Sequence, residues 1–135
     1  MSRPHATTAA ARPPRESEAL AGPAEATYLG TTAAPSVTHR VALAGEGRLG
    51  DAVTLTVDRE GLHIRSERGG WFVPRADLRG ARPASRHAGT RAPAGGALLS
   101  VTWVLDGTGL ISGFELGRES DPGGLVAAIQ AVVPS

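Results

Sequence analysis

The sequence predicts a mainly β domain of about seven short antiparallel strands, closed by one C-terminal α-helix at about 121–133. Three observations predict this fold. Apolar and polar residues alternate with a period of two in several runs, which is typical of strands with one buried face. Polar turns that contain glycine separate these runs. Only the last segment changes to the period of a helix, so we expect this helix to close the open end of a small barrel or sandwich.

Residues 1–26 are predicted to be a disordered tail. They are rich in Ala, Pro, Thr, Arg and Glu and have almost no large apolar side chain, so they cannot bury enough surface to offset the entropy of the chain. They also lack the apolar core of a secretory signal. No apolar run in the chain reaches the length of about 18 residues that a membrane-spanning helix needs. The folded domain is therefore expected over 27–133.

Two strands are predicted before residue 51. The β-prone run 27–32 comes first, and it ends before Pro35, which cannot donate to a continuing ladder. Val41 and Leu43 then take alternate positions and indicate a second strand. Several glycines follow, so we expect a loop before the next strand.

The clearest hairpin lies in the segment 51–85, around which the rest of the chain is organised. Its first strand has a face of alternating apolar residues, Val53, Leu55 and Val57, which we expect to be buried. A short polar turn follows and ends in Gly61, a residue that can take positive φ. The strand must therefore reverse direction here.

The second strand of this hairpin alternates in the same way. Leu62 and Ile64 are expected to face the core, and His63 and Arg65 to face the solvent. His63 is accordingly interpreted as an exposed strand residue.

A third strand follows a glycine pair. It is the aromatic and β-branched run 71–73, which Pro74 ends. The segment 75–81 resumes as a weaker strand. The segment 82–96 is rich in proline, glycine and polar residues, so we expect a long loop there.

The last hairpin and the helix complete the domain. The most apolar strand, 97–105, is joined to its partner, 110–116, by the turn 106–109, which contains an Asp-Gly pair. Asp121 as N-cap and Pro122 at the first position then predict a helix start. The apolar stripe of this helix consists of Leu125, Ile129, Val132 and Val133.

Composition excludes several classes of function. The chain has 135 residues and no cysteine, which rules out disulfides, thiolate catalysis and cysteine-ligated metal sites. Its net charge of +1 argues against a general nucleic-acid binder, which needs many clustered cations. All 14 basic residues are arginines.

The charge is distributed unevenly along the chain. Residues 59–91 carry a net charge of about +5, and residues 92–135 about −3. We consider two interpretations of this bias: a solvated surface without a ligand, and a patch for an anionic partner. The arginines of the first segment are Arg59, Arg65, Arg68, Arg75, Arg79, Arg82, Arg86 and Arg91.

Residue types that could carry catalysis or bind a metal do not occur at matching spacings. Ser100 has no Gly-x-Ser-x-Gly elbow, and the Gly-x-Gly-x-x-Gly pattern at 45–50 is followed by a predicted strand where a dinucleotide site needs a helix. The histidines form no pair with metal-ligand spacing. They are His5, His39, His63 and His87. We therefore expect no enzymatic activity, no metal and no cofactor.

A series of short motifs resembles the actinobacterial pleckstrin-homology-like (PH-like) domain proteins, and the resemblance covers about residues 27–133. It implies a PH-like fold, in which two near-orthogonal antiparallel sheets form a partly open seven-stranded barrel capped by the C-terminal helix. Members of that family usually carry an N-terminal transmembrane helix. The motifs are the runs 28–32, 40–41, 49–50, 72–79, 87–89, 98–103 and 112–114, and Leu55 with Gly61-Leu62.

The chain departs from the family's pattern at three places. The apolar anchor that relatives place ahead of Tyr28 is replaced by the polar tail. His39 stands where relatives tend to have an acidic residue, and Thr90 where they tend to have a lysine.

Two functional hypotheses follow. The first is a cytoplasmic, non-catalytic interaction module that binds a protein or peptide at or near the membrane face, through a sheet edge or the groove beside the helix. The alternative is the binding of an anionic lipid or a phosphate ligand through an arginine-bearing loop or face. We favour the first, because a phosphoinositide-type site needs cations that converge from neighbouring strands. The candidate binding residues are His39, Arg40, Arg48, Arg65, Arg68 and Arg75.

Overall fold

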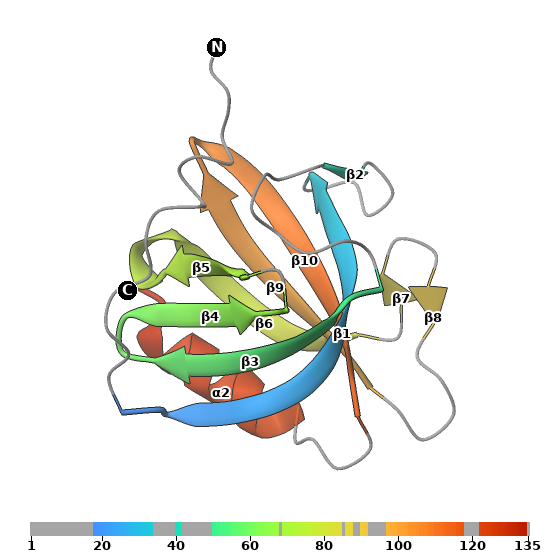
Figure 1. Ribbon diagram of the computed structural model, residues 1–135. Coiled ribbons are helices and arrows are strands. Elements are labelled where there is room, and N and C mark those ends of the chain that lie inside the picture. The colour runs from blue at the N-terminus through green and yellow to red at the C-terminus, as the bar shows by residue number, and fades with distance from the viewer. Residues whose placement is uncertain are drawn as a thin grey trace.

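The structure of the chain is a computed structural model (Figure 1) that describes residues 18–33, 40–41, 50–67, 69–84, 86–87, 90–91, 97–117 and 122–134. Its strands are β1 (Ala21–Ala33), β2 (Arg40–Val41), β3 (Ala52–Asp58), β4 (Gly61–Arg65), β5 (Trp71–Pro74), β6 (Leu78–Ala84), β7 (Arg86–His87), β8 (Thr90–Arg91), β9 (Ala97–Leu105) and β10 (Thr108–Leu116). A 3-10 turn, η1 (Arg75–Asp77), joins β5 to β6, and the helix α2 (Pro122–Val132) follows β10.

The main strands form one continuous antiparallel sheet in the order β5-β4-β3-β1-β10-β9-β6, with β2 beside β1. The long strand β1 joins the two halves of this sheet, β5-β4-β3 and β10-β9-β6. Its first part pairs with β3 from Ala21 to Thr27, and its later part pairs with β10 from Ala26 to Ala33. The two halves of the sheet therefore bend around β1, and β3 and β4 cross the direction of β9 and β10 (Figure 1). This confirms the predicted mainly β, partly open barrel of PH-like type.

The helix α2 lies across one end of the sheet (Figure 1). Its buried side chains are Leu125, Ala128, Ile129 and Val132, and they join the main hydrophobic core. The predicted apolar stripe is thus the buried face, with Val133 only partly buried. The predicted N-cap, Asp121, lies outside the described residues.

The central strands also have the predicted faces. Val53, Leu55 and Val57 of β3 are buried, and so are Leu62 and Ile64 of β4. The two aromatic residues Trp71 and Trp103 lie in the core with their ring centroids 5.4 Å apart. Burial of large rings next to aliphatic strand residues supplies most of the favourable free energy of such a small domain.

The structure differs from the prediction at the start of the domain. β1 begins at Ala21, so the predicted boundary at residue 27 lies inside a strand, and residues 21–26 are not part of a disordered tail. The Leu20 N–H also donates to the Val57 carbonyl, at 2.7 Å. In this part of β1, Ala26 is buried and Ala21 and Ala24 pack against the core, while the other three residues are exposed. Backbone pairing with β3 also holds it. Residues 1–17 lie outside the described part.

A second difference concerns the segment after Pro74. The chain first makes the turn η1, and β6 then runs from Leu78 to Ala84. The predicted weak strand therefore begins three residues late, and the first part of the predicted 82–96 loop belongs to β6. Pairing with β9 explains this, since Arg82, Pro83 and Ala84 lie opposite Ser100, Leu99 and Leu98. Within the part that the structure describes, α2 is too short to cross a bilayer, and no other helix qualifies.

Candidate functional site

The structure does not bring the predicted binding residues together in the part that it describes. His39, Arg48 and Arg68 lie outside the described residues, and Arg40 is placed in β2 without a described side chain. Arg65 and Arg75 are both exposed. They lie at opposite ends of the β4–β5 pair, because Gly61 at the start of β4 is opposite Pro74 at the end of β5. Each of the two arginines lines a different hollow.

The hollow next to Arg75 lies at the C-terminal end of α2 and has a volume of about 390 Å³. We call it the two-arginine pocket. Its lining consists of two arginines and five apolar or small residues from four different parts of the chain. They are Leu20, Arg59, Arg75, Ala131, Val132, Val133 and Pro134.

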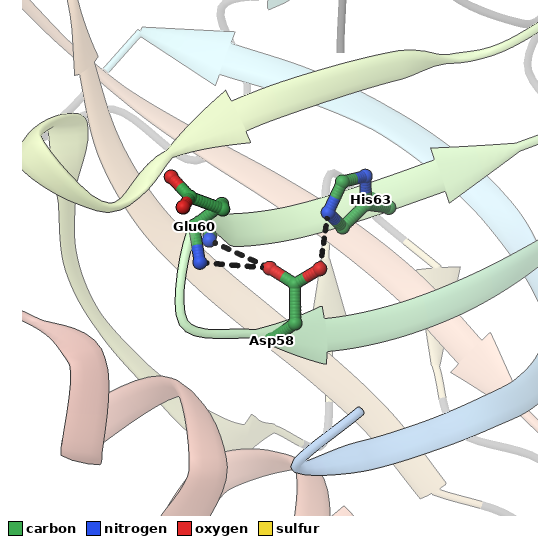
Figure 2. Close-up of polar contacts among 4 residues, drawn as sticks. Asp58, Glu60 and His63 are labelled. Atoms are coloured by element: carbon green, nitrogen blue, oxygen red, sulfur yellow. Dashed lines mark hydrogen bonds and ion pairs between the residues drawn. The ribbon is translucent and has the colours of Figure 1, made fainter. Parts of the chain in front are cut away.

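Arg59 is presented by the turn of the β3–β4 hairpin. Asp58 and Gly61 pair across the hairpin, so Arg59 and Glu60 are the two turn residues. The Asp58 Oδ1 accepts hydrogen bonds from the backbone N–H groups of Glu60 (2.8 Å) and Gly61 (3.2 Å), as Figure 2 shows for Glu60. A carboxylate that accepts two turn N–H groups fixes the local backbone. The position of the Arg59 Cα is thereby fixed as well.

His63 supports this carboxylate from the neighbouring strand. Its Nε2–H donates to the other oxygen, Asp58 Oδ2, at 2.9 Å (Figure 2). Asp58 and His63 are 0% and 2% exposed, so the prediction that His63 faces solvent is wrong. The imidazole also packs against the Phe72 ring, with centroids 4.7 Å apart. Alternation placed His63 correctly on the face opposite Leu62, but it could not reveal that this face is covered at this point.

Arg75 begins η1 directly after β5, and its backbone is tied to the Arg59 turn. The Arg75 N–H donates to the Glu60 carbonyl at 2.8 Å. Gly61 makes this close approach possible, because a Cβ at that position would overlap the Val73 carbonyl oxygen and come within 2.9 Å of the Arg75 nitrogen. The two arginines therefore lie on adjacent turns whose backbones are held together.

The apolar part of the pocket comes from both ends of the domain. Leu20 precedes β1 and is 47% exposed, the only large hydrophobic residue that is exposed in the described part. Val132, Val133 and Pro134 come from the end of α2 and the residues after it. An exposed leucine beside two cations gives the pocket a mixed character, and we call its five apolar residues the floor.

Neither guanidinium group has a partner within the described part of the chain. Arg59 and Arg75 are exposed, and their side chains make no ion pair or hydrogen bond with a described residue. The end of α2 carries partial negative charge that attracts cations, yet neither arginine donates to its last carbonyls. No described residue thus competes with a ligand for the N–H donors of these two groups.

One carboxylate in η1, that of Asp77, has a perturbed pKa. Partial burial raises the pKa of Asp77, and the nearby Asp106 carboxylate acts in the same direction, while Arg79 opposes the shift. Arg79 itself donates to the carbonyl oxygens of Ala76 (2.8 Å) and Leu78 (2.9 Å). Asp77 therefore belongs to the contact between η1 and the β9–β10 turn, and it does not line the two-arginine pocket.

A separate polar cluster lies inside the sheet, away from the pocket. Trp103 Nε1–H donates to Ser112 Oγ (3.0 Å), and the Thr31 hydroxyl lies between the hydroxyls of Ser112 (2.7 Å) and Tyr28 (2.5 Å). These side chains are all buried. The Trp103 indole N–H is thus satisfied by Ser112, whereas the buried Trp71 Nε1 has no partner among the described residues. The cluster satisfies core polar groups and does not reach the surface.

The described lining of the pocket contains groups that can bind an anion. Its described lining contains no serine, threonine, histidine or carboxylate, so it has no group that could act as a nucleophile or a general base. No three His, Asp or Glu residues of the described part lie close enough to hold a metal ion. Two arginines at an apolar floor can bind an anion and exclude water from one side of it.

Sequence reasoning included Arg75 but missed Arg59 and Leu20 as site residues. Arg59 could have been found by combining two predicted features, since a strand that starts at Gly61 and a partner strand that ends at Pro74 bring both turns to the same edge. Leu20 had a weaker signal, as the only large apolar residue near the end of the predicted tail.

Comparison with known proteins adds a family assignment. The model of the bacterial PH domain-like family matches residues 6–130 of the chain. No curated protein matches the chain.

Proposed function

The chain belongs to the bacterial PH domain-like family, and from this premise we propose that it is a non-catalytic interaction module that binds a protein or peptide partner. We place its action at or near the cytoplasmic face of the membrane, which is supported by its resemblance to PH-like proteins that carry a membrane anchor. Because one fold can carry many functions, the proposal needs a surface that fits a partner.

The two-arginine pocket is the observation that carries the proposal. It combines exposed cations without a described partner and an exposed apolar side chain at the end of α2. Arginine beside an apolar contact is a common composition for the centre of a protein interface. The fixed backbones of the two turns lower the ordering cost of binding there.

The sheet edges fit a partner less well than the pocket does. On β6, the Ala81 carbonyl accepts a hydrogen bond from Gln130 Nε2 (2.9 Å), and Pro83 has no N–H to offer to an added strand. On the other edge, β5 spans only Trp71–Pro74 and ends in a proline. Addition of a peptide strand needs a longer row of free backbone groups.

Binding of an anionic lipid or a phosphate ligand is the second candidate, and the same two arginines favour it. The described lining offers only two cations, and the exposed Glu60 lies between them in sequence and next to Arg59. A headgroup with several negative charges would need more cations than this. We therefore treat lipid binding as the competing outcome of the test.

The test is a quantitative capture experiment with the full chain as bait in a lysate of the source cell. We expect Arg59→Glu and Arg75→Glu to lose the same specific partner, and Arg82→Glu to retain it. Arg82 is a matched control because it is exposed on β6 and does not line the pocket. Circular dichroism must show that all four proteins are folded.

Sedimentation with vesicles of phosphatidylglycerol and phosphatidylcholine completes the test. Salt-sensitive vesicle binding that both pocket variants lose, together with no partner that depends on the pocket, would contradict the proposal and support the lipid alternative.

A further inference from the structure

We infer that the two-arginine pocket binds an acidic–apolar peptide segment, with a carboxylate between Arg59 and Arg75 and a neighbouring apolar side chain on Leu20 and Val133. This inference rests on the proposed function and specifies the chemistry of the partner. Three features of the pocket support it: the arrangement of the donors, the nature of the floor and the balance of charge.

The donors come from two turns that cannot move independently. The Arg75 N–H bond to the Glu60 carbonyl (2.8 Å) joins η1 to the β3–β4 turn. The Asp58 carboxylate accepts a hydrogen bond from the turn, and His63 holds this carboxylate in place. Both arginines are long and exposed, so their side chains can converge while their backbones stay in place. Guanidinium groups bind planar oxyanions through paired N–H donors, and a carboxylate is the simplest such group.

The floor determines which chemical group of the ligand can lie next to its anionic group. Five of the seven lining residues are Leu20, Ala131, Val132, Val133 and Pro134. A sugar or inositol phosphate would bring hydroxyl groups onto these side chains, which offer them no hydrogen bonds. An aliphatic or aromatic side chain would instead bury apolar surface against them. The volume of about 390 Å³ lies near the lower end of the range for ligand sites, about 300–1,000 Å³, and suits a short segment.

The local charge favours a ligand with few negative charges. Arg59 and Arg75 supply two positive charges, while the exposed Glu60 follows Arg59 directly and the exposed Glu18 lies two residues before Leu20. A single carboxylate gains from both arginines and meets less repulsion from these two acids than a polyanion does. A polyanionic headgroup or nucleic-acid backbone would meet the acids as well, and it would find no further cation in the described lining.

The experiment selects random displayed peptides on the immobilised full chain and measures the affinity of the enriched peptides by fluorescence anisotropy. We expect the enriched sequences to share an aspartate or glutamate next to an apolar residue. Arg59→Gln and Arg75→Gln should each weaken binding about tenfold, and replacing the peptide's acidic residue by its amide should have an effect of similar size. Arg82→Gln is the matched control and should leave the affinity unchanged.

A double-mutant cycle sharpens the assignment of contacts. If the carboxylate lies between the arginines, the loss caused by the amide peptide should be much smaller on the Arg59→Gln, Arg75→Gln double variant than on the unaltered chain. Enriched peptides without an acidic residue, or affinities that do not respond to the arginine substitutions, would overturn the inference. So would a selection that enriches no peptide.

Failure of this inference can be distinguished from failure of the proposed function. Amide chemical shifts of the labelled chain, measured with an enriched peptide, show where the peptide binds. Shifts along β6 or β5, with no change near Leu20, Arg59 and Val133, would overturn the pocket as the site and leave the interaction module in place. No enriched peptide together with pocket-dependent binding to anionic vesicles would overturn both.

Discussion

Two tight hairpins of this domain, β3–β4 and β9–β10, have turns of the same length but are stabilised in different ways. In β9–β10, Leu105 pairs with Thr108, and the two turn residues Asp106 and Gly107 have positive φ (49° and 82°). Such a turn matches the twist of the strands and needs residues that tolerate positive φ. In β3–β4 the turn residues are Arg59 and Glu60, which are not turn formers by type.

Buried side chains stabilise the β3–β4 turn, whereas the β9–β10 turn is stabilised by the backbone preferences of its own two residues. The Asp58 carboxylate holds two turn N–H groups, and His63 holds the carboxylate. The two central positions of this turn are therefore free to carry side chains for another purpose. This difference explains how an arginine can occupy the tip of a well-ordered turn and line the two-arginine pocket.

The largest expected difference between the two hairpins is the loss of stability when alanine replaces Gly61 or Gly107. Gly61→Ala should lower the free energy of unfolding by about 3 kcal/mol or more, because the Cβ would overlap the Val73 carbonyl oxygen. Gly107→Ala should cost only about 1 kcal/mol, since no atom lies within 4 Å of its Cβ and only the positive φ opposes it. Urea unfolding followed by tryptophan fluorescence measures both, and equal losses would remove the distinction between the turns.

The same substitution in both turns tests the role of the buried carboxylate. Asp58→Asn should destabilise the domain by about 1–3 kcal/mol, because the amide cannot accept from the turn and from His63 at full strength. Asp106→Asn should change stability by less than about 0.5 kcal/mol, since asparagine also tolerates positive φ and the site is exposed. A stability of the Asp58→Asn protein equal to that of the unaltered chain would show that the Asp58–His63 pair does not hold the turn.

A substitution at the tip of the β3–β4 turn should cost less stability than a substitution at its base. Arg59→Gln is expected to alter the free energy of unfolding by less than about 0.5 kcal/mol, because its exposed side chain has no described partner. The same variant should bind an enriched acidic–apolar peptide about tenfold more weakly. Thermal unfolding and fluorescence anisotropy on one sample give both values. A large loss of stability would assign Arg59 to the fold, with no separate role in binding.

The smallest expected effect concerns Asp77, next to the β9–β10 turn. Its raised pKa means that the folded state favours the protonated form, so the contribution to stability is present below the ordinary value of 3.8 and is lost as the pH rises through the folded-state pKa. Asp77→Asn should therefore be slightly more stable than the unaltered chain at neutral pH, and the gap should close in acid. Urea midpoints across this pH range check the sign. A gap that widens in acid would contradict it.

The sequence alone determined the elements that are stabilised by their own residues. Alternation identified the buried faces of β3 and β4, the Asp-Gly pair identified the β9–β10 turn, and the helical period after residue 121 identified the buried stripe of α2. These signals are strong because the residues that define each element also supply its stability. The PH-like fold, a partly open barrel with a C-terminal helix, was accessible through the resemblance.

Only the tertiary structure decided the start of β1, the burial of His63 and the position of Arg59 beside Arg75 and Leu20. The start of β1 is held by backbone bonds to β3 and buries only alanine side chains, so no pattern of large apolar residues marks it. His63 is buried on a face that alternation assigns to solvent. The two-arginine pocket joins residues from the start of the domain, two turns and the end of α2, and no spacing along the chain records a contact that exists only after the sheet closes around its core.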